Sequence, residues 1–339
     1  MKKILTAVAV LATMIVLTGC GGSKEGAGAG AEAKPVTVGI AKFVTHPALD
    51  AIEQGIQDGL AQAGYADAVY DLQNANADGN TAASIASKFR ADKVNLAVGI
   101  ATPTAIALAN GIKDIPVLYA AVTDPVSAGL VSSYSAGEGN VTGVSDMTPV
   151  KEQIELLASL VDLKRLGHIY SSSEANAVTL AQMAKEACAE LGIEFIESSV
   201  TNSAEVMQAA QALAGRVDGF YVSTDNTVVS ALSSLVDVAT RAGVPVMSAD
   251  PSSAEETPVL AAWGFDYYAM GVETGKMAAK ILGGASPASL PTLFMTDPSA
   301  VDLLINVDAA RVLGIALPED LVAGARTVVK DGAVIRQKS

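Results

Sequence analysis

Histidine, cysteine and aromatic side chains are scarce in this sequence. Its 339 residues include two histidines, two cysteines and one tryptophan, and aromatic residues make up 4% of the chain. No CxxC or HExxH motif is present, so no recognisable metal-ligand spacing occurs, and neither GxSxG nor a Walker A motif is found. No motif pairs a nucleophile with an activating base. We therefore expect a protein that is not an enzyme and that holds neither a metal nor a cofactor.

Basic residues are few relative to acidic ones. The chain has 22 Lys and Arg against 36 Asp and Glu, which gives a formal net charge of −14. Because nucleic-acid affinity rests mostly on basic contacts to phosphates, a nucleic-acid partner is excluded. Hydrophobic residues, in contrast, make up 50% of the chain, which is ample for sizeable cores. The length suggests about two domains.

The first twenty residues read as a targeting segment. Met1-Lys2-Lys3 is basic, and residues 4–17 are almost entirely apolar but too few to span a membrane. The Leu-Thr-Gly-Cys that ends at Cys20 resembles the lipobox of bacterial lipoproteins, in which the cysteine is acylated. We therefore predict a signal peptide over 1–19, a lipid anchor on Cys20 and a flexible Gly/Ala-rich tether over 20–34. A plain signal peptide is the alternative; either reading places the protein outside the cytoplasm, in the periplasm or on the outer face of the cell membrane.

From Pro35 onward, short β-branched runs alternate with amphipathic helical patterns. Such alternation predicts α/β architecture with parallel sheets buried on both faces. The expected strands cover 36–40, 68–71, 96–98, 116–119, 167–170, 194–197, 219–222 and 245–247. The expected helices cover 47–63, 79–89, 178–191 and 227–241.

This pattern occurs twice. Residues 36–50 align with 166–179, 94–105 with 217–228, and 115–125 with 244–251. The repeat predicts two similar doubly wound lobes, and in such sheets ligands bind beyond the carboxyl ends of the strands. Six loops are expected there: 41–47, 99–104, 121–127, 171–177, 223–227 and 248–253.

The pattern changes after residue 262. We expect a helix over 264–282, a short strand over 293–295 and a short helix over 307–313. Mixed elements after two complete lobes are typical of segments that cross back between them. The first lobe would then comprise 35–145 and about 264–300, and the second 146–263 and about 301–339.

Several ordered motifs resemble one known family. They are Val38-Gly39-Ile40, His46-Pro47-Ala48-Leu49-Asp50, Ala101-Thr102-Pro103-Thr104-Ala105, Val122-Thr123-Asp124-Pro125, Asn140-Val141-Thr142-Gly143-Val144-Ser145-Asp146 and Asp266-Tyr267-Tyr268. They look like the ABC-transporter substrate-binding lipoproteins of the tryptophan/tyrosine-binding type. The resemblance implies a type I periplasmic-binding-protein fold that closes by a hinge over an aromatic amino acid, with a cognate ABC permease as partner. The chain departs from the family's usual Gln, Glu and Asn at Lys42, Thr45 and Ser171, and Lys42 leaves open a ligand with extra negative charge.

A free amino acid needs donors for its carboxylate, and helix N-termini supply them. Thr102-Pro103 and Thr45-His46-Pro47 are expected to be N-cap and N1 pairs. By the resemblance, hydroxyl groups of Thr104 and Thr123 join this grip on the carboxylate, with Asp124 in the same loop. The alternative is that the threonines only cap helices.

The ligand ammonium needs a carboxylate partner. Asp225 and Glu174 are the leading candidates, since both follow strands of the second lobe in polar loops, and each has the alternative of an N-cap or a solvated loop acid. Asp250 is similar but is also placed to brace the hinge. Asn176 and Asn226 are expected to bind the ligand or to fix these loops.

Apolar and aromatic side chains near the cleft loops are expected to form the walls of the site. Phe43 and Trp263 are candidates, with core packing as the alternative, and His46 is placed to line the pocket. These observations together predict a monomeric, lipid-anchored solute receptor of an ABC importer. A signalling receptor on the same fold, a binder of a non-aromatic metabolite and an extracytoplasmic enzyme are the alternatives.

Overall fold

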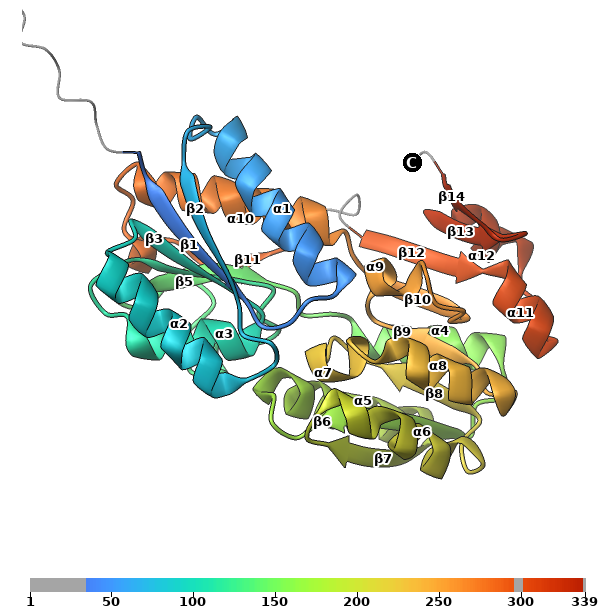
Figure 1. Ribbon diagram of the computed structural model, residues 1–339. Helices are drawn as coiled ribbons and strands as arrows, with labels where there is room; N and C mark the ends of the chain where they lie inside the picture. Colours follow the sequence, from blue (N-terminus) through green and yellow to red (C-terminus); the bar gives the residue numbers. More distant parts are fainter. Residues whose placement is uncertain (1–34, 296–300, 338–339) are drawn as a thin grey trace, which may run out of the picture. The chain divides into compact units, whose positions relative to one another are not determined.

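The structure is a computed structural model that describes residues 35–295 and 301–337 (Figure 1). Within these residues, none of the helices combines the length and the apolar character needed to cross a bilayer. The predicted signal peptide, the tether and Cys20 lie outside the described residues.

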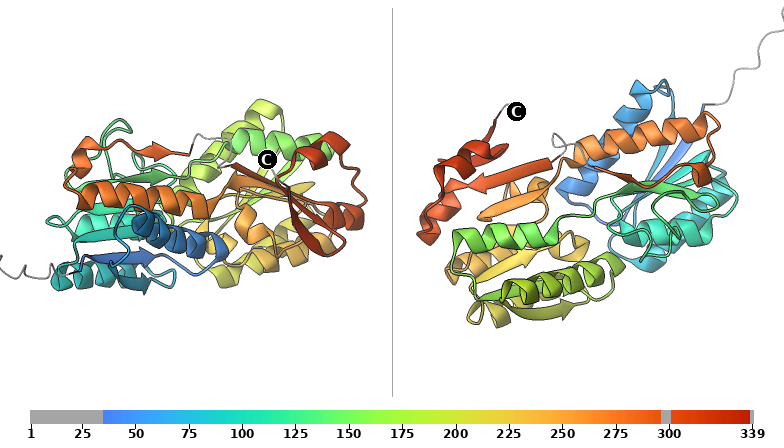
Figure 2. Two further views of the ribbon diagram at one scale, coloured as in Figure 1. Left: turned by 90° about the horizontal axis from the view of Figure 1, so that it is seen from above. Right: turned by 180° about the vertical axis from the view of Figure 1, so that it is seen from behind.

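The first lobe is built on a six-stranded sheet with the order β11-β5-β4-β3-β1-β2. Among the described residues, its paired strands all run parallel. Its strands are β1 (Thr37–Lys42), β2 (Val69–Asn74), β3 (Leu96–Ile100), β4 (Val117–Ala120), β5 (Val141–Ser145) and β11 (Leu293–Phe294). Its helices are α1 (Pro47–Gln62), α2 (Gly79–Asp92), α3 (Thr102–Gly111) and α10 (Tyr267–Leu282), with a 3-10 turn η2 (Pro287–Ser289). Helices α1 and α10 lie side by side on one face, and α2 and α3 cover the other (Figures 1 and 2).

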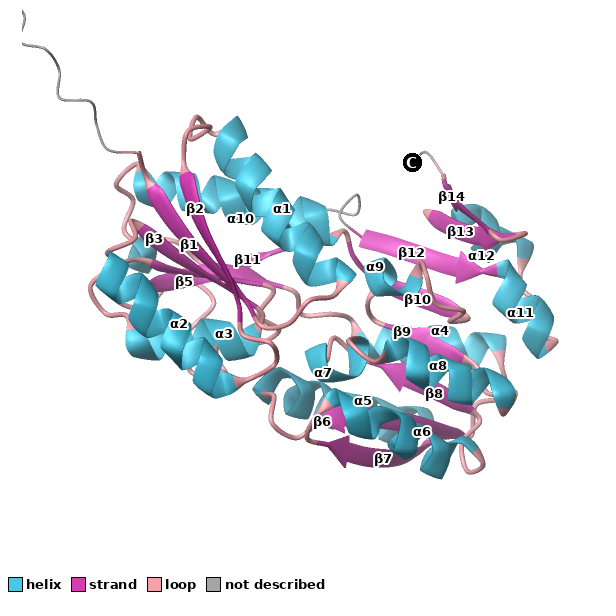
Figure 3. Ribbon diagram, viewed as in Figure 1, coloured by secondary structure: helices cyan, strands magenta, loops and turns pink. Residues whose placement is uncertain are grey.

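The second lobe is built on an eight-stranded sheet with the order β14-β13-β12-β10-β9-β8-β6-β7 (Figure 3). Its strands are β6 (Arg165–Ser171), β7 (Glu194–Val200), β8 (Gly219–Val222), β9 (Val246–Ser248), β10 (Ala261–Phe265), β12 (Val301–Asn306), β13 (Thr327–Lys330) and β14 (Ala333–Arg336). Its helices are α4 (Val150–Leu160), α5 (Ala175–Leu191), α6 (Val206–Ala214), α7 (Asn226–Val229), α8 (Leu232–Arg241), α9 (Pro251–Ala254), α11 (Val307–Leu313) and α12 (Glu319–Gly324), with a 3-10 turn η1 (Ser203–Glu205).

The two sheets share one topology over their first five strands. The order β2-β1-β3-β4-β5 of the first lobe matches β7-β6-β8-β9-β10 of the second. The prediction of two similar doubly wound α/β lobes is therefore confirmed. The chain passes between the sheets three times, after β5, after β10 and after β11.

Burial explains why these segments fold as they do. Strands β3, β4 and β5 are buried along their whole length, as expected for parallel strands covered on both faces. Helix α1 buries Leu49, Ile52, Ile56 and Leu60, which recur every three or four residues on one stripe. In the second lobe, one apolar cluster under α6 and α8 and another under α4 and α5 fill the two sides of the sheet.

Five of the six predicted helices have limits that differ from the observed ones, and two of these differences have a clear local cause. The helix expected over 264–282 starts at Tyr267, because Gly264 and Phe265 belong to β10 and Asp266 caps the helix by accepting from the Ala269 N–H at 3.0 Å. The helix expected over 227–241 is two helices, α7 and α8, which are separated near Ala231.

The antiparallel end of the second sheet was not predicted. Strand β12 runs antiparallel to β10, and β13 and β14 form an antiparallel hairpin beside it. Cys188 of α5 lies buried as a free thiol among apolar side chains, and this burial raises its pKa to about 12. The thiol is therefore an inert core group, as its helical position suggested.

Candidate functional site

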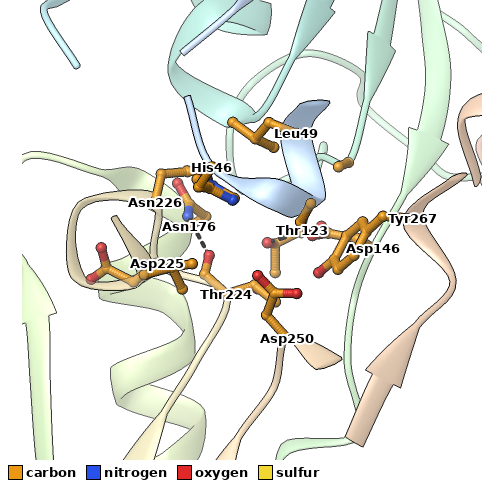
Figure 4. A pocket seen from close by; sticks show the side chains of 13 residues that line it. His46, Leu49, Thr123, Asp146, Asn176, Thr224, Asp225, Asn226, Asp250 and Tyr267 are labelled. Atoms are coloured by element: carbon orange, nitrogen blue, oxygen red, sulfur yellow. Dashed lines mark hydrogen bonds between the residues drawn. The ribbon is translucent and has the colours of Figure 1, made fainter. Parts of the chain in front are cut away.

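A cavity lies where the carboxyl ends of the strands of both sheets meet (Figure 4). It contains about 330 Å³ of empty space, including the part open to solvent. Five of the six expected loops contribute to it, and the loop 99–104 does not. Its lining residues are His46, Ala48, Leu49, Ala121, Thr123, Asp146, Asn176, Thr224, Asp225, Asn226, Val229, Asp250 and Tyr267.

The lining is acidic. Three carboxylates, from Asp146, Asp225 and Asp250, contribute to it, and none of the described Lys or Arg residues does. Asp146 follows β5, and its Oδ1 accepts a hydrogen bond from Thr123 Oγ1 at 3.2 Å. Burial raises the pKa of Asp146 to about 6 despite this bond and the one from the Tyr267 hydroxyl. Such a site is electrostatically suited to a ligand that brings positive charge.

Asp250 is the carboxylate with a free oxygen. Its Oδ1 accepts from the Ser253 N–H at 3.2 Å and so caps α9. Its Oδ2 is buried and has no hydrogen-bond partner among the described residues, and the carboxylate points into the cavity in Figure 4. A buried carboxylate oxygen without a partner is costly, so this atom is a built-in acceptor for a ligand donor.

Both carboxylate oxygens of Asp225, in contrast, accept hydrogen bonds from backbone N–H groups. Its Oδ1 accepts from the Val228 N–H at 3.0 Å, and its Oδ2 accepts from the Ser171 N–H at 2.5 Å. Burial and the neighbouring Glu174 carboxylate raise its pKa well above the usual value, against these bonds. In Figure 4 its carboxylate points away from the middle of the cavity. The sequence-based choice of Asp225 as the ammonium partner is thus not supported, because its oxygens tie β6 to α7.

Glu174 lies behind the lining rather than in it. Its Oε1 accepts from the Thr227 N–H at 2.9 Å and the Thr227 hydroxyl at 2.7 Å. Its Oε2 accepts from Asn226 Nδ2 at 2.6 Å. With donors on both oxygens, Glu174 braces the first residues of α7 and has no oxygen left for an ammonium.

His46 connects the two lobes. It precedes α1 in the first lobe, and its Nε2 lies 3.5 Å from Oδ1 of Asn226, which begins α7 in the second. Burial lowers the pKa of His46 below its usual value, although nearby carboxylates oppose this shift. Within the described chain, its Nδ1 is buried without a partner, and so are Oδ1 of Asn176 and Oγ1 of Thr224.

The N-terminus of α1 opens onto the cavity. Ala48 and Leu49, in its first turn, both line the cavity. The first N–H groups of a helix have no intrahelical acceptor and carry the positive end of the helix dipole. In a 16-residue helix this end is well suited to a carboxylate.

The predicted threonine caps are wrong. The N-cap residues of α1 and α3 are His46 and Ala101, and neither helix has a side-chain cap. Thr45 is exposed and accepts from Asn74 Nδ2 at 2.8 Å. The Thr104 hydroxyl donates to backbone carbonyl groups at the end of β3, and Thr102 is buried away from the lining.

Three more predicted residues lie outside the lining. Phe43 is buried in the apolar core of the first lobe. Asp124 Oδ1 accepts from the N–H groups of Val126 and Ser127 and from the Tyr134 hydroxyl. Trp263 packs beside a core cluster of the second lobe, and its carbonyl accepts from Gln153 Nε2 at 2.5 Å. Local structure accounts for each of them.

The departures from the family pattern also lie away from the cavity. The Lys42 ammonium pairs with Asp50 at 2.6 Å and with Glu53 at 3.2 Å. The Ser171 hydroxyl bonds to that of Ser173 at 2.9 Å. Because neither Lys42, Thr45 nor Ser171 lines the cavity, these departures give no reason to expect an anionic ligand.

Seven lining residues were not selected from the sequence: Ala48, Leu49, Ala121, Asp146, Thr224, Val229 and Tyr267. Asp146 and Tyr267 stand immediately after strand β5 and at the start of α10, where the chain crosses between the sheets. Their place at crossovers, within the motifs 140–146 and 266–268, was the available signal. Ala121 has a φ of 52°, which is strained for a residue other than glycine and which the sequence does not show.

Comparisons with known proteins agree with this architecture. The sequence profile described as "ABC transporter substrate binding protein" matches residues 37–329. A tyrosine-binding protein of Clostridioides difficile (strain R20291) is 36% identical over 323 residues, which cover 92% of each chain.

Two solved structures are similar at comparable identity. The ABC domain from Streptococcus pneumonia in complex with L-Trp is 35% identical, with a TM-score of 0.83 over 87% of this chain and 100% of that one. A substrate-binding protein with adhesive properties from Clostridium difficile, in a ligand-free, open structure, is 38% identical, with a TM-score of 0.64 over 84% of this chain and 97% of that one. The fold is that of type I periplasmic binding proteins, and the chain belongs to the ABC transporter substrate-binding protein family.

Proposed function

We propose that this protein is the receptor of an ABC importer for an aromatic amino acid, held at the membrane by a lipid on Cys20. Members of the family bind solutes outside the cytoplasm and are not enzymes. The observation that carries the proposal is the buried Oδ2 of Asp250, which no described residue partners, in a cavity that the carboxylates of Asp146 and Asp250 line and no described Lys or Arg does.

The proposed pose follows from the charges of the lining. The ligand ammonium binds Asp250 Oδ2, with Asp146 close by, because these carboxylates need a positive partner. The ligand carboxylate faces the first turn of α1 at Ala48 and Leu49, where helix N–H groups are unsatisfied. A zwitterion with both groups on one carbon fits this pairing of acceptor and donor.

The remaining lining suits an aromatic side chain. Leu49, Val229 and Ala121 supply apolar surface, and Tyr267 and His46 supply rings. The relatives support the same class of ligand, since one is named as a tyrosine-binding protein and the structure of another was solved with L-Trp.

The similarity scores support a closed cleft. At nearly equal identity, the chain matches the L-Trp complex with a TM-score of 0.83 and the ligand-free, open structure with 0.64. The short distance between His46 and Asn226, from different lobes, agrees with closure. In the mechanism that we propose, ligand shifts the receptor toward this form by hinge rotation, and the permease receives the closed receptor.

A ligand panel tests the proposal. Purified protein, stripped of bound ligand by unfolding and refolding, is titrated with tryptophan, tyrosine and phenylalanine and with leucine, aspartate, a sugar and a nucleoside. Ligand at about 100 times its Kd stabilises the native state by about 2.7 kcal/mol, which raises the Tm by a few degrees. Tryptophan, tyrosine and phenylalanine are expected to give shifts that leucine, aspartate, the sugar and the nucleoside do not. If no aromatic amino acid raises the Tm but the sugar or the nucleoside does, the ligand assignment is contradicted.

A further inference from the structure

The side chains of Glu174, Asn226 and His46 form a chain of contacts that ends in the cavity. Glu174 accepts on both oxygens, from Thr227 on Oε1 and from Asn226 Nδ2 on Oε2. A carboxylate used in this way only accepts, so it fixes which end of the Asn226 amide faces it. The amide nitrogen faces Glu174, and the carbonyl Oδ1 therefore faces His46.

This orientation determines the proton position on His46. Oδ1 of Asn226 can only accept, and it lies 3.5 Å from His46 Nε2. Nε2 therefore carries the proton. The ring is buried, with 8% of its surface exposed, and burial favours its neutral form. Nδ1 is then left with a lone pair, and it is the ring atom that no described residue partners.

We propose that Glu174 and Asn226 are positioning residues that hold His46 as its Nε2–H tautomer, so that Nδ1 accepts a hydrogen bond from an N–H or O–H donor on the aromatic side chain of the ligand. The inference deepens the proposed function and rests on it. Because His46 belongs to the first lobe and Asn226 to the second, the tautomer is fixed only when the cleft is closed.

The other unpartnered atoms of the described lining favour a ligand with two donor groups. Asp250 Oδ2 and Asn176 Oδ1 accept only, and the Thr224 hydroxyl can do either. Asp250 takes the ammonium, which leaves His46 Nδ1 and Asn176 Oδ1 for a second donor. The indole N–H of tryptophan and the hydroxyl of tyrosine provide one, whereas the ring of phenylalanine does not. A site with buried acceptors discriminates against a ligand that leaves them unpaired.

Nitrogen NMR of histidine tests the tautomer directly. The chain has two histidines, and His168 is an internal reference, because its Nδ1 lies 2.8 Å from the backbone carbonyl of Tyr221 and must donate. In protein labelled with ¹⁵N-histidine and saturated with L-tryptophan, we expect one Nε2–H ring, His46, and one Nδ1–H ring, His168. Two Nδ1–H rings in the wild-type complex overturn the proposal.

Glu174→Gln should reverse the arrangement. The introduced glutamine would keep its oxygen on Thr227 and present its NH₂ group to Asn226, so the asparagine amide turns and its nitrogen faces His46. We expect His46 to become the Nδ1–H tautomer in this variant. Asp302→Asn is the control, because it removes a partly buried carboxylate that bonds to Thr327 outside the cavity lining, so His46 should stay Nε2–H. A tautomer unchanged in folded, tryptophan-bound Glu174→Gln contradicts the relay.

Calorimetry tests the contact with the ligand. The wild type should bind tryptophan or tyrosine about 5- to 100-fold more tightly than phenylalanine. His46→Phe keeps a ring without an acceptor and should reduce this ratio toward one. An unchanged ratio contradicts the contact, and a wild type that binds none of the three overturns the proposed function itself.

Discussion

Gly59 of α1 and Gly275 of α10 face each other across a helix pair with no room for a side chain. A Cβ atom built on Gly275 would lie 2.9 Å from Gly59 Cα and 2.8 Å from the Leu60 backbone nitrogen. Gly55 and Gly271 meet in the same way one turn along. The contact joins a helix from the start of the described chain to one that follows β10 of the second lobe.

Gly275→Ala should therefore destabilise the protein. The added methyl group meets backbone atoms, which cannot rotate away, so we expect a loss of about 1–3 kcal/mol in the free energy of unfolding. Urea denaturation measures it. Gly79→Ala is the matched control, since a Cβ there meets nothing within 4 Å, and its stability should stay the same or rise. Equal stability of the two variants would contradict the close packing of α1 and α10.

Asp250→Asn should weaken binding of the aromatic amino acid strongly. The substitution keeps Oδ1, which caps α9, but removes the charge that pairs with the ammonium. We expect a loss of about 2–5 kcal/mol, or roughly 30-fold to several thousand-fold in Kd, measured by calorimetry. Asp78→Asn changes an N-cap aspartate of the same kind in α2, away from the cavity, and should leave Kd unchanged. Wild-type affinity in Asp250→Asn would show that Asp250 does not pair with the ligand ammonium.

His168 should make stability depend on pH. It is buried in β6 beside Tyr170, Phe195 and Tyr221, and burial lowers its pKa to about 4. An unfolded histidine binds its proton near pH 6.5, so between about pH 6.5 and 4 the unfolded chain holds more protons and stability falls as pH falls. The contribution lost over this range is about 3 kcal/mol.

The measurement is the difference in unfolding free energy between wild type and His168→Phe at several pH values. This difference separates His168 from Asp146, whose raised pKa of about 6 acts in the opposite direction. The advantage of the wild type should shrink steadily between pH 6.5 and 4.5. A constant difference across this range would show that His168 does not titrate on unfolding.

Cys20→Ser tests the lipid anchor. Wild-type protein expressed in its native type of cell should sediment with membranes, because the acyl chains bury in the bilayer. The serine variant cannot be acylated and should be released or remain unprocessed. Membrane retention and normal processing of Cys20→Ser, judged by fractionation and intact-mass measurement, would rule out the lipobox.

Much of the fold was predictable because it depends on local patterns. The β-branched and apolar run at Gly219–Val222 and the helix Val307–Leu313 were predicted with their observed limits. Strands β13 and β14 were missed, although Asp331-Gly332 between them, both with positive φ, is a hairpin signal.

The site was predictable only as a set of loops. Asp225, Glu174 and Asp250 all follow strands, so the sequence alone makes them similarly good candidates for binding the ligand ammonium. They differ in their contacts with distant parts of the chain. The Ser171 N–H donates to Asp225 and the Thr227 N–H donates to Glu174, whereas Asp250 keeps one oxygen that no described residue partners. Such pairings depend on how separate loops meet, which no local pattern encodes.

The glycine contact between α1 and α10 also bears on the order in which the chain completes its two lobes during synthesis. Helix α1 emerges from the ribosome early, but its partner α10 is made only after β6 to β10 and their helices. The second repeat can therefore assemble its five parallel strands while the first still exposes the glycine stripe of α1. A chain truncated after β10, at residue 265, would therefore hold all five parallel strands of the second repeat beside a first repeat that lacks α10 and β11.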